Sequence, residues 1–172
     1  DAEDLGSSLP SRAYHVKGRI ISVPSNYDPV TRAYTGLWNG TFKEAWTNNP
    51  AWVFYDLIIN DRFGLGEFID ASMVDKWSLY AIAQYCDQQV PSGFKTPQGA
   101  IVYEPRYTYN NVIQDRKEAF YALQSITTAW RGMAFWAIGQ VFPTIDMPSD
   151  PIKLVTPANV IGGEFTYSST AT

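Results

Sequence analysis

Apolar residues recur at helical spacing on two sides of the segment that follows Asn49 and Pro50. Asn is a favoured N-cap, and Pro suits the first helical position because the backbone N–H there needs no partner within the helix. One apolar stripe consists of Phe54, Leu57 and Ile58, and the other of Trp52, Tyr55 and Ile59. The pattern predicts a helix over residues 50–60, stopped by Gly64 and Gly66. Because this short helix is apolar on two sides, it must be packed between other elements.

A second helix is predicted after Ser72. Ser72 and Asp75 resemble a capping box, with Asp in place of the usual Glu or Gln. The helix would run over residues 73–90, where Pro91 ends it. Its apolar positions form two stripes: Val74, Trp77, Ala81 and Tyr85, and then Leu79, Ile82, Cys86 and Val90. This element is also expected to be buried on more than one side.

A third helix is predicted over about residues 115–131. Asp115 and Glu118 form another pair like a capping box, and Gly132 stands where a left-handed residue commonly closes a helix. The stripe expected to face the core consists of Phe120, Leu123, Thr127 and Trp130. The chain should therefore contain about three helices.

Strands are predicted on both sides of these helices. Residues 13–23 alternate, with Tyr14, Val16, Gly18 and Ile20 on one face. Residues 31–38 and 41–46 flank Asn39-Gly40, a strong signal for a two-residue hairpin. Later in the chain, residues 133–138 and 141–145 flank Gly139-Gln140 and indicate a second hairpin.

The remaining segments are assigned from composition and shorter patterns. Residues 91–105 are rich in Pro, Gly and Ser and are predicted to be a loop, and residues 103–113 to be extended. Two short strand-like segments, 152–155 and 164–167, complete the pattern. Strands and helices therefore do not alternate regularly, which argues against a doubly wound fold.

The order of elements predicts an α+β fold, with about three helices packed on a mainly antiparallel sheet and preceded by a β-rich arm with a hairpin. We divide the chain into three parts. Residues 1–12 are acidic and then rich in Gly, Ser and Pro, which indicates a linker or frayed end. Residues 13–47 form the arm of strand and hairpin, and residues 48–172 a compact α+β domain.

The composition of the 172 residues excludes several classes of protein. Hydrophobic residues make up 45% and charged residues 17%, which is typical of a globular chain. The net charge of −4, without runs of Lys or Arg, argues against a nucleic-acid partner. No apolar run approaches the ~20 residues of a membrane span. Aromatic residues reach 15%, and they would either fill the core or form an exposed surface for a partner or a sugar.

The residues that could support catalysis or metal binding are few. His15 is the single histidine and lies on a predicted strand, while Cys86 is the single cysteine and lies in a helical apolar stripe. Two carboxylates would suffice for glycoside hydrolysis, and the candidates are Asp56, Asp61, Glu67, Asp70, Asp146 and Asp150. Several of them stand at helix ends, where charged residues commonly act as caps. We therefore expect no catalytic residues, no metal site and no cofactor.

Aromatic residues near Asn39-Gly40 are the best candidates for contact with a partner. Trp38 and Phe42 lie beside the predicted turn, and Tyr27 lies in the Asn-Tyr-Asp-Pro segment before it. An exposed aromatic hairpin would be a plausible anchor for a neighbouring subunit. The alternative is that these side chains pack back onto their own chain, and the sequence does not decide between the two.

Short motifs spread over nearly the whole chain from about Tyr14 onward resemble one family. The densest are Trp46-Thr47-Asn48-Asn49-Pro50-Ala51-Trp52, Tyr55-Asp56 and Arg62-Phe63-Gly64-Leu65-Gly66, with further ones such as Tyr34-Thr35-Gly36-Leu37-Trp38-Asn39-Gly40-Thr41-Phe42 and Thr156-Pro157-Ala158-Asn159-Val160. They are similar to the central region of the tail tip attachment protein J family, also called host specificity protein J, of lambda-like phages and prophages.

The resemblance implies a structural role in a virion. Members of the family form a trimeric central hub of the tail tip, so residues 48–172 would be a hub-like domain. The expected partners are two further copies of the protein and other tail tip and tail tube proteins, without nucleic acid or a membrane span. The protein would be located at the virion tail tip, and in the host bacterial cytoplasm during assembly. Host recognition is expected elsewhere in the parent chain. The alternative function is an aromatic-rich carbohydrate-binding or cell-wall-degrading module.

Overall fold

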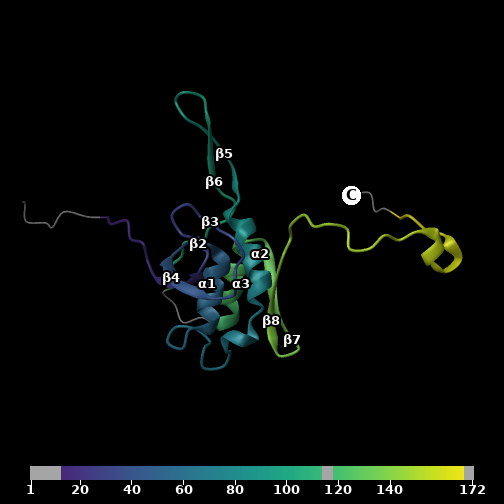
Figure 1. Cartoon of the computed structure of the whole chain (residues 1–172), viewed down its shortest axis with the longest axis horizontal. Coiled ribbons are helices and arrows are strands. Elements are labelled where there is room, and N and C mark those ends of the chain that lie inside the picture. Colours follow the sequence, from purple (N-terminus) through teal and green to yellow (C-terminus); the bar gives the residue numbers. More distant parts are fainter. Residues whose placement is uncertain (1–12, 114–117, 169–172) are drawn as a thin grey trace, which may run out of the picture.

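The computed structural model describes residues 13–113 and 118–168, and within them the chain has an α+β fold, as predicted (Figure 1). The helices described are α1 (Pro50–Ile59), α2 (Lys76–Asp87) and α3 (Ala119–Ala129), with short 3-10 turns at Ala71–Met73, Pro157–Asn159 and Ile161–Gly163. The strands described are β1 (Ile20–Pro24), β2 (Tyr27–Asp28), β3 (Ala33–Tyr34), β4 (Phe42–Trp46), β5 (Gln89–Lys95), β6 (Ile101–Pro105), β7 (Gly132–Ala137) and β8 (Gln140–Ile145). They form separate two-stranded antiparallel ladders and not one sheet.

Helix α1 lies at the centre of the body, as its two apolar sides predicted. It contacts α2, α3 and β1, and Trp52, Phe54 and Ile58 on it are completely buried. Its N-terminus is the predicted one, because Asn49 Oδ1 accepts a hydrogen bond from the backbone N–H of Ala51 (3.0 Å). The bounds of 50–60 were thus predicted to within one residue.

Helix α2 is shorter at both ends than predicted. Asp75 is itself the N-cap, since its Oδ1 accepts from the backbone N–H groups of Trp77 and Ser78, both at 3.2 Å. Ser72 lies instead in a 3-10 turn capped by Asp70. The helix ends at Asp87, and Val90 and Pro91 belong to β5. The predicted range 73–90 was therefore wrong at its ends, because Asp75 is the stronger cap.

Helix α3 covers less than the predicted 115–131. Asp115 lies outside the described residues, and Glu118 is the N-cap without a hydrogen bond from its side chain. The left-handed residue after the helix is Arg131 (φ +61°) and not Gly132. Gly132 is required for another reason: a Cβ there would lie 1.9 Å from the carbonyl oxygen of Thr144. Of the predicted inward stripe, Thr127 and Trp130 are buried and Leu123 packs against the core, whereas Phe120 is exposed.

The predicted hairpin around Asn39-Gly40 is wrong. β4 pairs with β1 in the register Ile20↔Trp46 to Pro24↔Phe42, and β3 pairs with β2. Asn39 Oδ1 accepts from both the backbone N–H (3.1 Å) and the hydroxyl (2.6 Å) of Thr41, so a side-chain turn replaces the strand-to-strand turn. On β1 the buried residues are Ile21, Val23 and Pro24, and Ile20, on the predicted inward face, is exposed.

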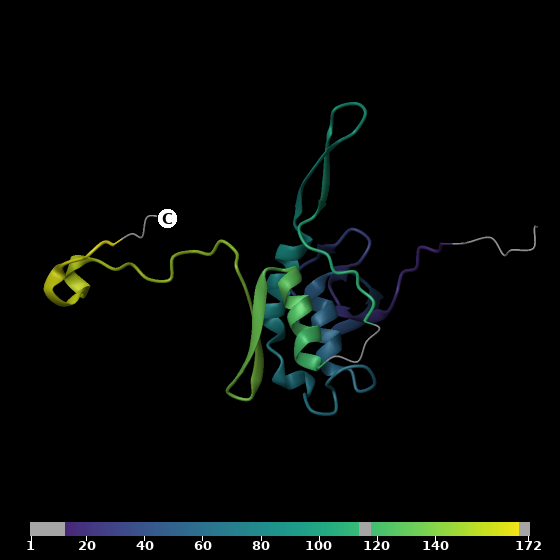
Figure 2. The same ribbon diagram turned by 180° about the vertical axis from the view of Figure 1, so that it is seen from behind.

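Three segments assigned from composition or short patterns also differ from their predicted structure. The predicted loop 91–105 is largely the β5–β6 hairpin, which projects from the body (Figure 2). Beyond Pro105, the backbone N–H of Tyr109 donates to Asn48 O (2.8 Å) without forming a strand. The strand-like segments 152–155 and 164–167 are not strands but parts of an extended C-terminal arm. The predicted hairpin around Gly139-Gln140 is confirmed as β7–β8.

The apolar core is shared by segments before and after Thr47. Ile21, Val23 and Trp38 belong to the same buried cluster as Phe54 and Leu79. Residues 13–15 and the C-terminal arm, residues 146–168, extend away from this body in different directions (Figures 1 and 2). The predicted linker at residues 1–12 lies outside the described residues. No helix in the described part of the chain is both long and apolar enough to cross a membrane.

Candidate interaction surfaces

The three predicted contact residues lie where the N-terminal segment meets the helices. Trp38 is 7% exposed and stacks on Tyr80 of α2, with ring centroids 4.8 Å apart and planes at 13°. Phe42 stacks on Tyr55 of α1 at 4.7 Å, and Tyr27 is completely buried beside Tyr34. Of the two alternatives that the sequence left open, the structure shows these side chains packed onto their own chain. Partner contact by these residues stays a prediction.

This aromatic cluster accounts for much of the aromatic content. Trp38 also meets Trp77, Phe42 and Trp52 edge to face. Its indole N–H donates to the carbonyl oxygen of Thr41 (2.6 Å). Such edge and stacked pairs add about 0.5–1.5 kcal/mol each to the burial of the rings. Most of these rings therefore stabilise the fold and are not free to bind a sugar.

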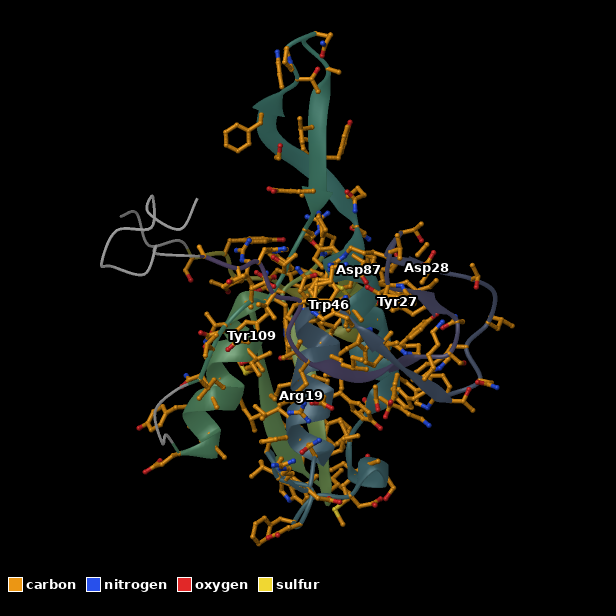
Figure 3. The ribbon with its side chains drawn as sticks, turned by 90° about the vertical axis from the view of Figure 1, so that its left-hand side faces the viewer. Arg19, Tyr27, Asp28, Trp46, Asp87 and Tyr109 are labelled. Carbon is orange, nitrogen blue, oxygen red and sulfur yellow. The ribbon has the colours of Figure 1, made fainter. Side chains whose placement is uncertain are left out.

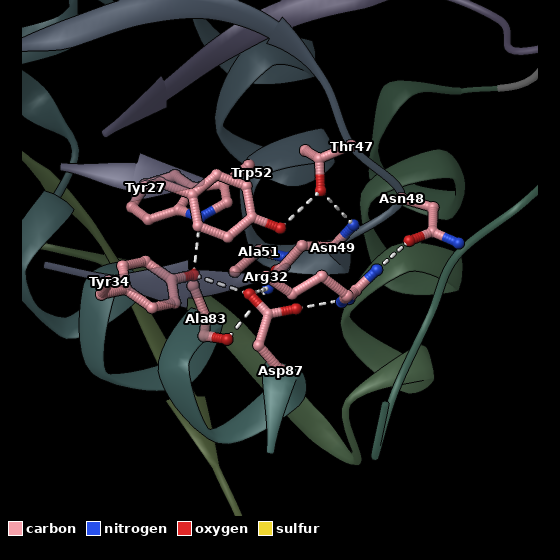
Figure 4. Close-up of polar contacts among 10 residues, drawn as sticks. All are labelled: Tyr27, Arg32, Tyr34, Thr47, Asn48, Asn49, Ala51, Trp52, Ala83 and Asp87. Atoms are coloured by element: carbon pink, nitrogen blue, oxygen red, sulfur yellow. Dashed lines mark hydrogen bonds and ion pairs between the residues drawn. The ribbon is translucent and has the colours of Figure 1, made fainter. Parts of the chain in front are cut away.

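A buried polar cluster lies beside the aromatic one and is centred on Asp87 (Figure 4). Asp87 Oδ1 forms an ion pair with Arg32 Nη2. Its Oδ2 accepts from the hydroxyl of Tyr34 and from Nδ2 of Asn49, both at 2.8 Å. Nη1 of Arg32 donates to Asn48 Oδ1. The cluster thus joins the β2–β3 turn, the start of α1 and the end of α2.

Burial governs the protonation of this cluster. It raises the pKa of the Asp87 carboxyl above its ordinary value, while the Arg32 guanidinium opposes that shift. Three donors surround the carboxyl, and such an arrangement favours the carboxylate. Burial raises the pKa of Tyr27 to about 12 and also raises the pKa of Tyr34. The negative charge of Asp87 is the second largest cause of both increases. Both phenols therefore remain neutral at ordinary pH, and that of Tyr34 donates to Asp87.

Asn49 performs several tasks in this cluster. Its Oδ1 caps α1, and its Nδ2 donates to Asp87 and to the carbonyl oxygen of Ala83 (2.9 Å). Its backbone N–H donates to the hydroxyl of Thr47 (3.1 Å), which also shares a hydrogen bond with Tyr27. The sequence identified Asn49 as a cap but not as a link between helices. We assign the cluster to the stability of the fold.

A groove of about 930 Å³ lies between residues 16–19, α1 and residues 109–113. Arg19 Nη2 and Asp56 Oδ2 form an ion pair of 3.2 Å across it (Figure 3 labels Arg19, Trp46 and Tyr109 at this side). Burial raises the pKa of Asp56, and Arg19 lowers it. The Trp46 ring in the groove lies under Lys17 Nζ, 5.2 Å from its centroid. Among the described residues that line the groove, Asp56 is the one carboxylate, so these residues do not supply the pair that glycoside hydrolysis needs.

The other residues considered for chemistry have structural surroundings. Cys86 is completely buried, as predicted, and burial raises the pKa of its thiol to about 12. Asp70 Oδ1 accepts from the backbone N–H of Ser72 (2.8 Å), so it caps the 3-10 turn. Among the described residues no group of three His, Cys, Asp or Glu side chains could hold a metal ion.

Exposed apolar side chains gather on the segments that project from the body. On the β5–β6 hairpin they are Phe94, Ile101, Val102 and Tyr103, and on the C-terminal arm they are Ile152, Leu154, Val155, Ile161, Phe165 and Tyr167. A third group, Met133, Phe135 and Trp136, lies on β7. These residues were not predicted as a contact surface from the sequence, since a loop and short strands were expected there. The alternation of Ile101 and Tyr103 was the available signal for the hairpin.

No family model matches the chain. Two curated relatives match nearly all of it. It is 46% identical over 169 residues, or 98% of its length, to Tip attachment protein J of Escherichia phage SECphi27. It is 38% identical over 163 residues, or 94% of its length, to Tip attachment protein J of Escherichia phage SECphi4. The chain spans 14% of the length of each relative.

Proposed function

The chain corresponds to a segment of the tip attachment protein J family of phages, and on that basis we propose that it is a structural domain of a phage tail tip. The observation that carries the proposal is the match of nearly the whole chain, at 46% identity, to a protein of that name. Identity at this level over 169 residues implies the same fold and supports a related role. The proposed location is the virion tail tip, with the host bacterial cytoplasm as the place of assembly.

The geometry supports a role in assembly. The body is held by a buried polar cluster and an aromatic cluster, whereas the β5–β6 hairpin and the C-terminal arm present apolar side chains to solvent. Contiguous exposed apolar surface commonly marks a site of protein–protein contact. We therefore assign the body the role of a rigid support and the projecting segments the role of contacts.

The proposed partners are two further copies of the parent protein, in a homotrimeric hub, and other tail tip and tail tube proteins. Host recognition is assigned to another region of the parent chain. A structural role needs neither a catalytic residue nor a cofactor, and none is proposed.

Location can be tested on assembled virions. A short epitope inserted after Gln98, in the exposed turn between β5 and β6, should leave the body intact because this turn lies away from the core. Gold-labelled antibody should then mark the tail tip in electron micrographs of phage that carry the tagged parent protein. Label at the capsid or along the tail shaft, or none on virions while the tagged protein is made, would overturn the proposal.

The oligomeric state has its own test. Native mass spectrometry of the full-length parent protein should give a mass of three copies. A monomeric parent at micromolar concentration would remove the homotrimer but leave the location at the tail tip to be judged by the labelling.

A further inference from the structure

Strand β7 has an unpaired outer edge. In the β7–β8 ladder, Trp136 lies opposite Val141 and Ala134 opposite Pro143. The carbonyl oxygen of Val141 accepts from the backbone N–H of Asp75 (3.1 Å), so it points away from β7. Beyond the ladder, Asp146 N–H donates to Arg131 O (3.4 Å). Because hydrogen-bonded and non-bonded pairs alternate, the backbone groups of Ala134 and Trp136 point outward from β7.

The other edge of the ladder is paired at Val141. An isolated parallel bridge joins Val141 of β8 to Val74, and β8 lies toward α2 (Figure 1). In the described part of the chain, no backbone hydrogen bond joins Ala134 or Trp136 to an element other than β8. Among the described residues, β7 therefore offers an open edge of this ladder.

The sequence of β7 does not protect that edge. Native edge strands usually carry a charge, a proline or a bulge that prevents pairing with another chain. β7 reads Gly-Met-Ala-Phe-Trp-Ala, and its register with β8 is regular throughout. Trp136 is 56% exposed, and Phe135 stacks on Phe142 with centroids 5.8 Å apart on the outer face. An incoming strand would find both free backbone groups and apolar side chains.

A segment with the properties of a strand leaves the same ladder. Ile152, Lys153, Leu154 and Val155 lie between Pro151 and Pro157, and their composition favours a strand. Ile152 is 99% exposed and Leu154 is 80% exposed. Among the described residues, the backbone N–H groups of Ile152 and Lys153 have no hydrogen-bond partner. The carbonyl oxygen of Leu154 accepts a hydrogen bond from Asn159 Nδ2 (3.2 Å).

The arm does not suit the edge of its own β7. To reach it, residues 146–151 would have to pass over the chain that enters β7 from α3 at Arg131. Connections rarely cross at the same end of a sheet. The hydrogen bond from Asp146 to Arg131 also holds the start of the arm on the β8 side. Six extended residues span about 20 Å, which is enough to reach a neighbouring molecule.

We propose that residues 152–155 of one copy add as a strand to the open edge of β7 in a second copy. The segment of the arm that adds as a strand and the edge of β7 that accepts it are different surfaces of each copy. The contact is therefore head to tail, and it gives a closed assembly only when the copies form a ring. The inference deepens the proposed function and rests on it, because a ring of three copies would be the proposed homotrimer.

The first test uses light scattering on the 172-residue chain over a range of concentrations. The chain should associate, and the double variant Ile152→Asp/Leu154→Asp should weaken association at least about tenfold, because two charges would meet the apolar face of β7. The matched control is Ile161→Asp, an equally exposed apolar residue of the same arm outside the strand segment, which should associate as the unmodified chain does. A chain that stays monomeric at high concentration, or equal association by the double variant, would overturn the proposal.

Hydrogen exchange followed by NMR locates the contact. The amides of Met133 and Phe135 bond within the β7–β8 ladder and should be protected at every concentration. Those of Ala134 and Trp136 should gain protection only as the chain associates. Association without protection at these two amides would show that another surface carries it, and protection without association would show that the arm pairs with its own chain. Either result would contradict exchange between copies, while virion labelling would still decide the location separately.

Discussion

Trp38 stacks on Tyr80 and thereby fastens the loop before β4 to helix α2, with ring centroids 4.8 Å apart. The contact is made from positions 42 residues apart and lies beside the edge contacts of Trp38 with Trp77 and Trp52. The loop before β4 therefore belongs to the core by its side chains, although its backbone forms no regular strand.

Trp38→Ala should lower the free energy of unfolding by about 3–5 kcal/mol, because it removes a buried indole from this cluster. Urea denaturation followed by circular dichroism measures the loss. Leu37→Ala is the matched control, since Leu37 is adjacent and fully exposed, and it should change stability by less than about 0.5 kcal/mol. Equal midpoints for the two variants would show that Trp38 is not in the core.

Asp87→Asn should cost about 3 kcal/mol, because it leaves the Arg32 guanidinium buried without its countercharge. A second Arg32→Met substitution in this background should cost much less than Arg32→Met alone. The double-mutant cycle measures that coupling in urea. Glu44→Gln, at an exposed position of β4, serves as the control for loss of one negative charge. Additive effects of the two core substitutions would contradict a coupled ion pair.

Alkaline pH should destabilise the fold through Tyr27. Its pKa is about 10 in an unfolded chain and about 12 in the fold, so the unfolded state loses its proton first. The stabilising contribution is complete below pH 10 and is lost as the pH rises through 12. Two pKa units correspond to about 3 kcal/mol.

The measurement is the free energy of unfolding from pH 8 to pH 12. Tyr27→Phe should reduce the decline, and Tyr34, whose pKa is also raised, should account for a remaining part. Tyr14→Phe, at an exposed tyrosine, should leave the decline as it is in the unmodified chain. A decline of the same size in Tyr27→Phe would exclude this tyrosine as its source.

Gly132→Ala should destabilise the β7–β8 ladder by at least about 1–3 kcal/mol, because the new methyl group would meet the Thr144 carbonyl oxygen and the Trp130 indole. Gly18→Ala is the matched control, since a Cβ there would have no neighbour within 4 Å. Thermal unfolding of the two variants compares them. A melting temperature for Gly132→Ala equal to that of Gly18→Ala would contradict the close approach.

Local signals in the sequence predicted the elements whose ends are determined locally. Asn49 and Pro50 begin α1 through hydrogen bonds to the next turn, and Gly139 lies in a turn that joins neighbouring strands. Both features need information from only a few residues. The α+β class followed from the order of such elements.

Pairing between distant segments was not predictable in this way. β1 and β4 join residues 20–24 to 42–46, and the competing hairpin signal at Asn39-Gly40 was stronger locally. The side-chain turn of Asn39 and the burial of Trp38 override that signal. In β5–β6, Pro and Gly concealed a hairpin, since Pro at an unbonded position does not interrupt a two-stranded ladder.

The burial of the candidate contact residues was not predictable from the sequence. Trp38, Phe42 and Tyr27 were selected for their aromatic rings, and burial cannot be read from residue type alone. The side chains that the structure leaves exposed, such as Phe94 and Leu154, lie on segments whose projection from the body depends on the complete fold.

The cluster around Asp87 also has a consequence for synthesis on the ribosome. Tyr34 and Asp87 are separated by 53 positions, and Arg32 is made earlier still. At about 5–20 residues per second, these N-terminal residues wait roughly 3–11 s for the carboxylate that they surround. The last turn of α2 thus completes the polar cluster of the N-terminal half. Until Asp87 is translated, the nascent chain contains an arginine that lacks its countercharge.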